Sequence, residues 1–166
     1  LNQIKINVPN FLKNDEVSKK AMIDLLDGLI FDQGTVRVKT LDELIKYCYK
    51  VAGTVGILMC FSLDCKDNEA KKFAIDLGIA MQLTNIIRDV LEDAKMDRRY
   101  LPSSMTKNIL PIEILSINEN QDHISQKIIL QRALGKIFNI SENYYCSGRS
   151  GLYFLPFKIR IGLSVY

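Results

Sequence analysis

The sequence predicts an all-α protein, and three observations support this class. Apolar residues recur at three- and four-residue intervals over long segments, which is the spacing of one face of a helix. Residues that cap helices precede these segments, and helix-ending glycines or prolines follow several of them. Alternation typical of strands is confined to a few residues. The expected architecture is therefore a bundle of packed helices.

The predicted helices follow one another through short connections. They cover roughly residues 15–33, 40–63, 68–95, a short segment from Pro111, 121–146 and a last helix from about Pro156. The first can be capped by Asn14 or Asp15 and is ended by Gly34. The second begins at Thr40, and Glu43 three residues later completes the spacing of a capping box. We expect loops or turns at residues 35–38, 96–108 and 147–151.

Composition excludes several classes of function. The balance of 22 Lys+Arg against 19 Asp+Glu leaves a net charge of +3, which is far too weak for a nucleic-acid-binding surface. The four cysteines show no CxxC spacing, and His123 is the only histidine, so we expect reduced thiols rather than a zinc site. The longest apolar run, residues 51–63, is shorter than the roughly 20 residues of a bilayer span. No signal-peptide pattern is present, and a soluble cytoplasmic protein is expected.

A polar stripe runs along the predicted helix 68–95. Its members are spaced by three or four residues and are Gly78, Gln82, Asn85, Asp89 and Asp93. Glu92 lies beside them. The rest of the helix is apolar, so it should be buried, and buried carboxylates are costly unless they find a cation or a donor. Mg²⁺ fits, because it takes few protein oxygens and bridges to phosphates. The stripe therefore predicts a magnesium-diphosphate site; the alternative is an exposed charged helix end with ordinary ion pairs.

Two strings of residues carry a resemblance to a known family. Residues 78–94, GIAMQLTNIIRDVLEDA, followed by Arg98, Tyr100, Leu101 and Pro102, closely resemble the second aspartate-rich motif of the phytoene and squalene synthase family. Residues 47–56, YCYKVAGTVG, resemble a second family segment. A fainter resemblance covers residues 22–32 and 144–160, so that roughly residues 20–162 are included.

This resemblance implies a helical isoprenoid-synthase fold and an enzyme that joins two prenyl diphosphates head to head through a cyclopropyl diphosphate. The first expectation is a prenyltransferase that converts geranylgeranyl diphosphate to phytoene with Mg²⁺, or Mn²⁺ in its place, and without a reductant. One alternative is a C30 product, dehydrosqualene or squalene, of which squalene requires NADPH. Another is a non-catalytic relative that assembles respiratory complexes, although such relatives tend to lose the acidic motif that this chain keeps.

The resemblance also implies roles for individual residues. The metal ligands would be Asp89 and Asp93, supported by Asn85 and Glu92. The catalytic residues would be Asp89, Asp93, Tyr47 and Arg88. The substrate-binding residues would be Tyr47, Val51, Val55, Gln82, Asn85, Arg88, Arg98 and Tyr100. Small residues on the two helices, Ala52, Gly53, Gly56 and Gly78, are expected to let the helices approach closely.

The chain also departs from the family pattern. The family's first aspartate-rich motif, of DxxxD form, lies before the region of Met22, and Asp24 and Asp27 fall in the place of a later helix. Leu91 and Asp97 stand where many members carry glycine. The chain begins without Met and ends inside an apolar run. We therefore expect residues 1–166 to be the central part of a single domain, an incomplete bundle without the flanking helices. Peripheral membrane association is expected because the product is insoluble in water.

Overall fold

The structure, a computed structural model, describes residues 15–65, 67–119 and 123–154. Its helical elements are α2 (Glu16–Phe31), α3 (Leu41–Cys48), the π-helix η1 (Tyr49–Gly53), α4 (Thr54–Ser62), α5 (Asn68–Arg88), α6 (Val90–Lys95), α7 (Ser103–Thr106), α8 (Pro111–Glu119), α9 (Ile124–Ser150) and the 3₁₀-helix η2 (Gly151–Phe154). Among the described residues there is no β-strand, only an isolated bridge between Arg37 and Arg99. The predicted all-α class is confirmed, and the predicted helix from Pro156 lies outside the described residues.

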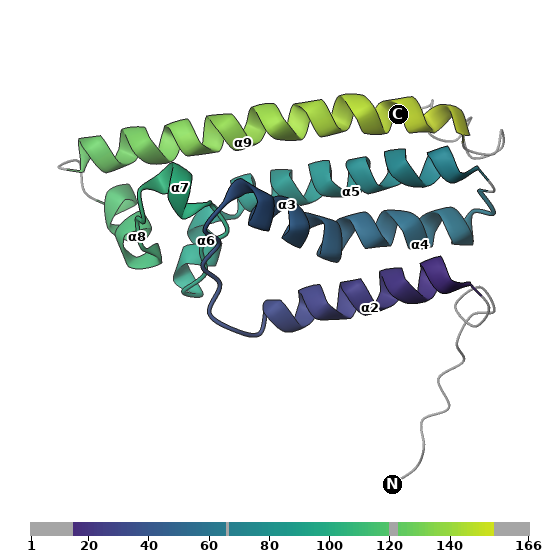
Figure 1. Cartoon of the computed structure of the whole chain (residues 1–166). Helices are drawn as coiled ribbons and strands as arrows, with labels where there is room; N and C mark the ends of the chain where they lie inside the picture. Colours follow the sequence, from purple (N-terminus) through teal and green to yellow (C-terminus); the bar gives the residue numbers. More distant parts are fainter. Residues whose placement is uncertain (1–14, 66, 120–122, 155–166) are drawn as a thin grey trace, which may run out of the picture.

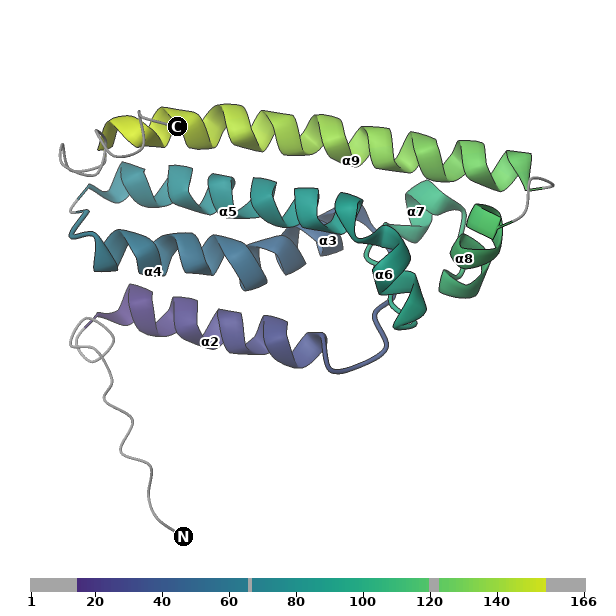
Figure 2. The same cartoon turned by 180° about the vertical axis from the view of Figure 1, so that it is seen from behind.

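The four long helical stretches lie side by side in chain order. Helix α2 packs against α4, α4 against α5 and α5 against α9, while α6, α7 and α8 gather at one end of this layer (Figures 1 and 2). The main core joins residues of α3, α5, α8 and α9 with those of the loops at the same end. Its fully buried members include Val36, Leu44, Leu83, Leu101, Ile114 and Ile137.

The predicted helix starts are confirmed by side-chain caps. The Asp15 carboxylate accepts a hydrogen bond of 2.8 Å from the Ser18 amide at the start of α2. The Thr40 hydroxyl accepts one of 3.2 Å from the Glu43 amide, and the Glu43 carboxylate in turn accepts one of 2.7 Å from the Lys39 amide. These bonds satisfy donors that the first turn of a helix leaves unpaired.

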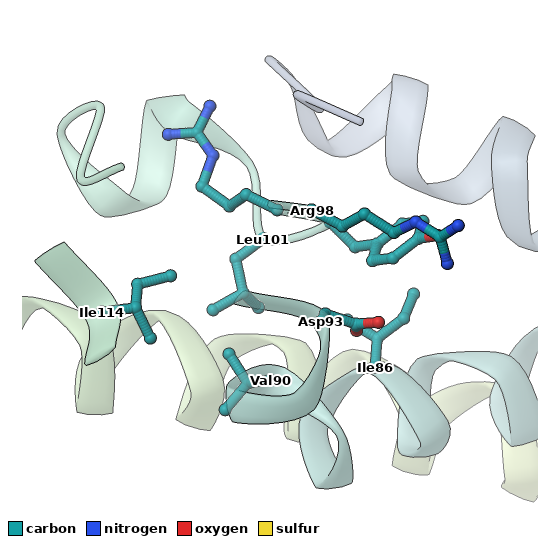
Figure 3. A pocket seen from close by; sticks show the side chains of 8 residues that line it. Ile86, Val90, Asp93, Arg98, Leu101 and Ile114 are labelled. Atoms are coloured by element: carbon teal, nitrogen blue, oxygen red, sulfur yellow. The ribbon is translucent and has the colours of Figure 1, made fainter. Parts of the chain in front are cut away.

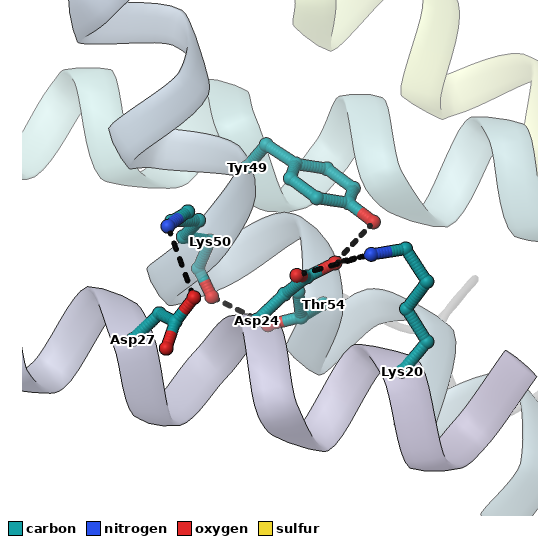
Figure 4. A network of polar contacts seen from close by, with 6 residues as sticks. All are labelled: Lys20, Asp24, Asp27, Tyr49, Lys50 and Thr54. Carbon is teal, nitrogen blue, oxygen red and sulfur yellow. Dashed lines mark hydrogen bonds and ion pairs between the residues drawn. The ribbon is translucent and has the colours of Figure 1, made fainter.

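The second predicted helix is one helical run, but it contains a π-helical segment, η1, that the sequence did not predict. Polar contacts between α2 and this segment fix its position (Figure 4). The Tyr49 hydroxyl donates to Asp24 over 3.5 Å, and the Lys50 ammonium lies 3.4 Å from the Asp27 carboxylate. Asp24 and Asp27 are therefore engaged in helix packing.

The same run, Leu41–Ser62, is the one described helix that is long and apolar enough to cross a membrane. It packs between α2 and α5, and 39% of its apolar window is buried by these contacts and the rest of the described structure.

Glycines allow η1 and α4 to approach α5 closely, as predicted. A Cβ atom on Gly56 would lie 2.2 Å from the Ala74 carbonyl oxygen, and one on Gly78 would lie 2.4 Å from the Ala52 carbonyl oxygen. Both neighbours are backbone atoms of a facing helix and cannot move aside by a rotamer change.

Gly56→Ala is therefore expected to lower the free energy of unfolding by about 3 kcal/mol, because overpacking forces the helices apart. Gly135→Ala is the matched control. Gly135 lies within α9, and nothing lies within 4 Å of an added Cβ, so this change should stabilise the protein by up to about 1 kcal/mol. Urea denaturation of both variants measures the contrast, and equal stabilities would contradict the predicted clash.

One predicted helix is interrupted, and one predicted boundary is wrong. The helix expected over residues 68–95 breaks at Asp89, whose φ of −99° and ψ of 12° separate α5 from α6. In a regular helix the side chains of successive residues point in different directions. At this break they can meet, and Arg88 pairs with Asp89. The turn expected at residues 147–151 is instead the end of α9, which continues to Ser150. Gly148 belongs to this helix because a Cβ there would lie 2.9 Å from Leu77 Cβ, so the glycine serves close packing rather than a turn.

All four cysteines are free, as expected. Cys48, Cys60 and Cys65 are buried, and Cys146 is exposed. Burial raises the pKa of the Cys60 thiol to about 11, so this thiol stays protonated at neutral pH.

Candidate functional site

The candidate site lies where the end of α2, the start of the second helical run, the break between α5 and α6 and the loop after α6 meet. Its centre is Asp32. The Tyr47 hydroxyl donates to Asp32 Oδ2 over 3.0 Å, and the Tyr100 hydroxyl donates to Oδ1 over 2.8 Å. The two phenol rings stack with centroids 4.9 Å apart. Arg98 Nη2 donates to the Asp32 backbone carbonyl over 2.8 Å. One residue thus joins three predicted site residues.

The loop that carries Arg98 and Tyr100 is held by backbone hydrogen bonds. The Arg98 amide donates to the Asp93 carbonyl over 2.8 Å, which turns the chain back at the end of α6. Asp97 adopts a positive φ of 54° at this turn. Aspartate tolerates this left-handed conformation and glycine adopts it freely. This explains how Asp97 can stand at a position where the resembled family often carries glycine.

Among the predicted ligands, Asp93 has the carboxyl whose pKa is shifted most. It lines a small pocket with apolar Ile86, Val90, Leu101 and Ile114, and Arg98 lies above it in the view of Figure 3. Burial raises the pKa of the Asp93 carboxyl to about 6, and the nearby charges of Asp89 and Asp32 add to this while Arg98 opposes it. Burial is thus the main reason that the Asp93 carboxyl keeps its proton to a higher pH than a free aspartate.

The other predicted ligands are not drawn into the same cluster. Asp89 accepts two hydrogen bonds from Arg88, of 2.7 and 2.6 Å, and these bonds lower the pKa of its carboxyl. Glu92 is exposed and pairs with Lys95 at 2.8 Å. Asn85 is half-buried one turn before Asp89. In the described part of the chain, no three His, Cys, Asp or Glu side chains form a group that could hold a metal ion. The four-residue ligand set stays a prediction.

The donor chemistry nevertheless fits Mg²⁺. Asp32, Asp89 and Asp93 offer only oxygen atoms as ligands. The negative charges of Asp32 and Asp89 contribute to the raised pKa of Asp93. Mg²⁺ commonly uses one or two protein carboxylates and completes its shell with waters and substrate phosphates. Asp93 and Asp89 are the residues that would hold it, and a bound divalent cation would offset the repulsion that raises the pKa of Asp93.

The remaining predicted site residues occupy different environments. Tyr47 is buried, and Tyr100 is buried beside it. Burial raises the pKa of both phenols, that of Tyr100 to about 12, so both hydroxyls remain donors at neutral pH. Val51 is half-buried and packs against the core, while the side chain of Val55 is exposed. Gln82 is half-buried on α5.

Sequence reasoning missed Asp32. It follows the last residue of α2, and its side-chain partners are 15 and 68 residues away in the chain. Its only sequence signal was its place at the end of the fainter similarity over residues 22–32, just before the helix-ending Gly34. No spacing rule relates it to Tyr47 or Tyr100.

Arg98→Ala is expected to weaken binding of inorganic pyrophosphate with Mg²⁺ at least tenfold in the full-length protein, because it removes the cation beside Asp93. The fold loses the hydrogen bond to the Asp32 carbonyl, worth about 1 kcal/mol, and a long contact of 3.9 Å to the Met96 sulfur. Calorimetry and thermal unfolding measure the two effects. The control is Lys72→Ala, which removes an exposed cation from the far part of α5, where Lys72 pairs with Glu69. A large drop in Tm with unchanged binding would assign Arg98 a structural role.

Comparisons with known proteins agree with these observations. The profile of the squalene/phytoene synthase family matches residues 6–166. A phytoene synthase of Pseudescherichia vulneris is 36% identical over 141 residues, covering 84% of this chain and 44% of the relative. A 15-cis-phytoene synthase of Enterobacter agglomerans is 36% identical over 163 residues, covering 94% of this chain and 53% of the relative. The chain thus spans about half the length of these relatives.

A solved structure shares the fold. The squalene synthase HpnC from Alicyclobacillus acidocaldarius superposes with a TM-score of 0.74 at 19% identity, over 89% of this chain and 54% of that one. The resemblance expected from residues 47–56 and 78–94 is confirmed by the family profile and by these relatives. The chain belongs to the squalene/phytoene synthase family of helical prenyltransferases.

Proposed function

We propose that the whole protein condenses two prenyl diphosphates head to head, and that its reaction is the conversion of two molecules of geranylgeranyl diphosphate to phytoene through a cyclopropyl diphosphate. Family membership supports the reaction type, and the relatives named phytoene synthase support the C40 product. The observation that carries the proposal is the position of Asp93, a half-buried carboxylate that lines one pocket together with Arg98 and Tyr100.

The residues of the site have separable tasks in this reaction. Mg²⁺, or Mn²⁺ in its place, would supply the charge that stabilises the departing diphosphate. Asp93 and Asp89 would hold the cation, and Arg98 adds a positive charge to the pocket that Asp93 lines. Tyr47 and Tyr100 keep their protons and orient Asp32. Apolar neighbours such as Ile86 and Val90 keep water away from the reacting centre.

Incubation of the full-length protein with geranylgeranyl diphosphate and Mg²⁺ tests this function. Phytoene should form without a reductant, and EDTA should abolish its formation while added Mg²⁺ restores it. Farnesyl diphosphate with and without NADPH is the parallel assay. Dehydrosqualene or squalene from that assay, with no phytoene from the first, would reassign the enzyme to C30 products. The absence of any product would overturn the proposal.

A non-catalytic assembly role is disfavoured by the acidic residues Asp89, Glu92 and Asp93, which such a role does not require. Peripheral membrane association is a proposal that follows from the oily product, and cytoplasmic localisation is a separate proposal. Cell fractionation tests both.

A further inference from the structure

Arg99 is a buried cation between two residues of the candidate site. Its exposed fraction is 5%. Its neighbours Arg98 and Tyr100 both bind Asp32. Successive side chains of an extended segment point to opposite sides, and the hydrogen-bond partners of Arg99 accordingly lie in the connection before α3, at the end of α7 and in the loop after α7.

The guanidinium of Arg99 binds neutral acceptors. Nη1 donates to the Ile109 carbonyl over 3.0 Å and to the Thr106 hydroxyl over 3.4 Å, and Nη2 donates to the Val38 carbonyl over 3.3 Å. Among the described residues no carboxylate pairs with Arg99, and its Nε has no hydrogen-bond partner. A charge buried in this way costs stability, whereas an apolar side chain of similar length would not.

The backbone of Arg99 joins the same parts of the chain. Its amide donates to the Val36 carbonyl over 3.0 Å, and its carbonyl accepts from the Val38 amide over 3.1 Å. Side chain and backbone together connect residues 36–38, 98–100 and 106–109. The planar fork of an arginine can bind two carbonyls in fixed directions, which a lysine ammonium cannot do in the same way.

We propose that Arg99 is a positioning residue, which fixes the 98–100 segment so that Arg98 and Tyr100 are held against Asp32 and beside Asp93. For its effect on ligand binding this inference rests on the proposed diphosphate site. The side-chain hydrogen bonds of Arg99 go to Val38, Thr106 and Ile109 and not to Asp32 or Asp93. Arg99 acts through the backbone that carries its two neighbours.

The test compares Arg99→Met, Arg99→Lys and the control Lys136→Met, which removes an exposed cation from α9, in the full-length protein. Inorganic pyrophosphate with Mg²⁺ is the binding probe. Arg99→Met should weaken its binding about tenfold with an unchanged or higher Tm, and in turnover it should raise KM more than it lowers kcat. Arg99→Lys should also weaken pyrophosphate binding. It keeps the positive charge, but it loses the planar fork that binds two carbonyls in fixed directions. Lys136→Met should match the parent.

Hydrogen exchange gives a readout that does not depend on the proposed function. The Val38 and Arg99 amides should exchange about tenfold faster in Arg99→Lys than in the parent. Parental binding and exchange in both Arg99 variants would overturn the inference. If Arg99→Met does not fold, Arg99→Lys decides by the same two measurements. If the parent binds no pyrophosphate, the diphosphate site is wrong, and the exchange rates still decide whether Arg99 holds this segment.

Discussion

Asp93→Asn in the full-length protein is expected to reduce turnover by at least about 100-fold while the fold remains intact. The amide keeps the size of the side chain and removes the charge that a divalent cation needs. It also removes the burial of a charge and the smaller repulsion from Asp89 and Asp32, which together raise the pKa of this carboxyl. Activity within a few-fold of the parent would show that Asp93 is not a metal ligand.

The same variant should change how stability depends on pH in metal-free protein. Because the folded pKa of Asp93 is about 6 and its ordinary value is 3.8, the folded state binds more protons between these values. The contribution of this group to the free energy of unfolding is therefore complete below pH 3.8 and is lost as the pH rises through 6. Solvent screening of a half-buried group reduces it to about 1–2 kcal/mol.

Urea titrations of parent and Asp93→Asn at pH 5 and pH 7 measure this difference. The parent should lose more stability than the variant between the two values, so that the variant is the more stable protein at pH 7. Identical pH profiles would contradict the raised pKa. Far-ultraviolet circular dichroism confirms that both proteins are folded.

Asp32→Ala is expected to be the most destabilising change within the site. It leaves the Tyr47 and Tyr100 hydroxyls without their acceptor, and each unpaired buried donor costs about 1–3 kcal/mol. We expect a loss of about 2–4 kcal/mol in the free energy of unfolding, together with loss of turnover as Tyr100 is released. Asp32→Asn retains an acceptor oxygen and should lose less stability.

Asp27→Ala is the matched control for Asp32→Ala. Asp27 lies in the last turns of α2, shortly before Asp32, and forms an exposed pair with Lys50 at 3.4 Å, so its removal should cost less than about 1 kcal/mol. Equal losses for the two alanine variants, measured by urea denaturation, would show that the Asp32 hydrogen bonds do not stabilise the fold.

Local features of the chain were predictable and long-range ones were not. The caps at Asp15 and Thr40 were found because each acts within three residues along the chain. The break at Asp89 was missed because the apolar helical spacing continues through it and no Gly or Pro marks it. The continued α9 was missed because Gly148 was interpreted as a turn residue. Its real role is packing against Leu77, which only the tertiary structure shows.

The candidate site divides in the same way. Asp93, Arg98 and Tyr100 follow one another closely in the sequence, and their motif was recognisable. Asp32 could not be recognised, because a carboxylate at the end of a helix is common. Only the folded structure brings the two tyrosines to it from distant parts of the chain. The π-helical segment after Cys48 likewise has no local signal in an apolar run.

The hydrogen bonds at Asp32 also bear on the order of folding. Tyr100 is 68 residues from Asp32, so this contact closes a long loop and gains its free energy only after the entropy of closure has been lost. Contacts of this kind form late and are weakly developed in the transition state. We therefore expect Asp32→Ala to accelerate unfolding and to leave the folding rate nearly unchanged. The helices would then form before the candidate site is assembled.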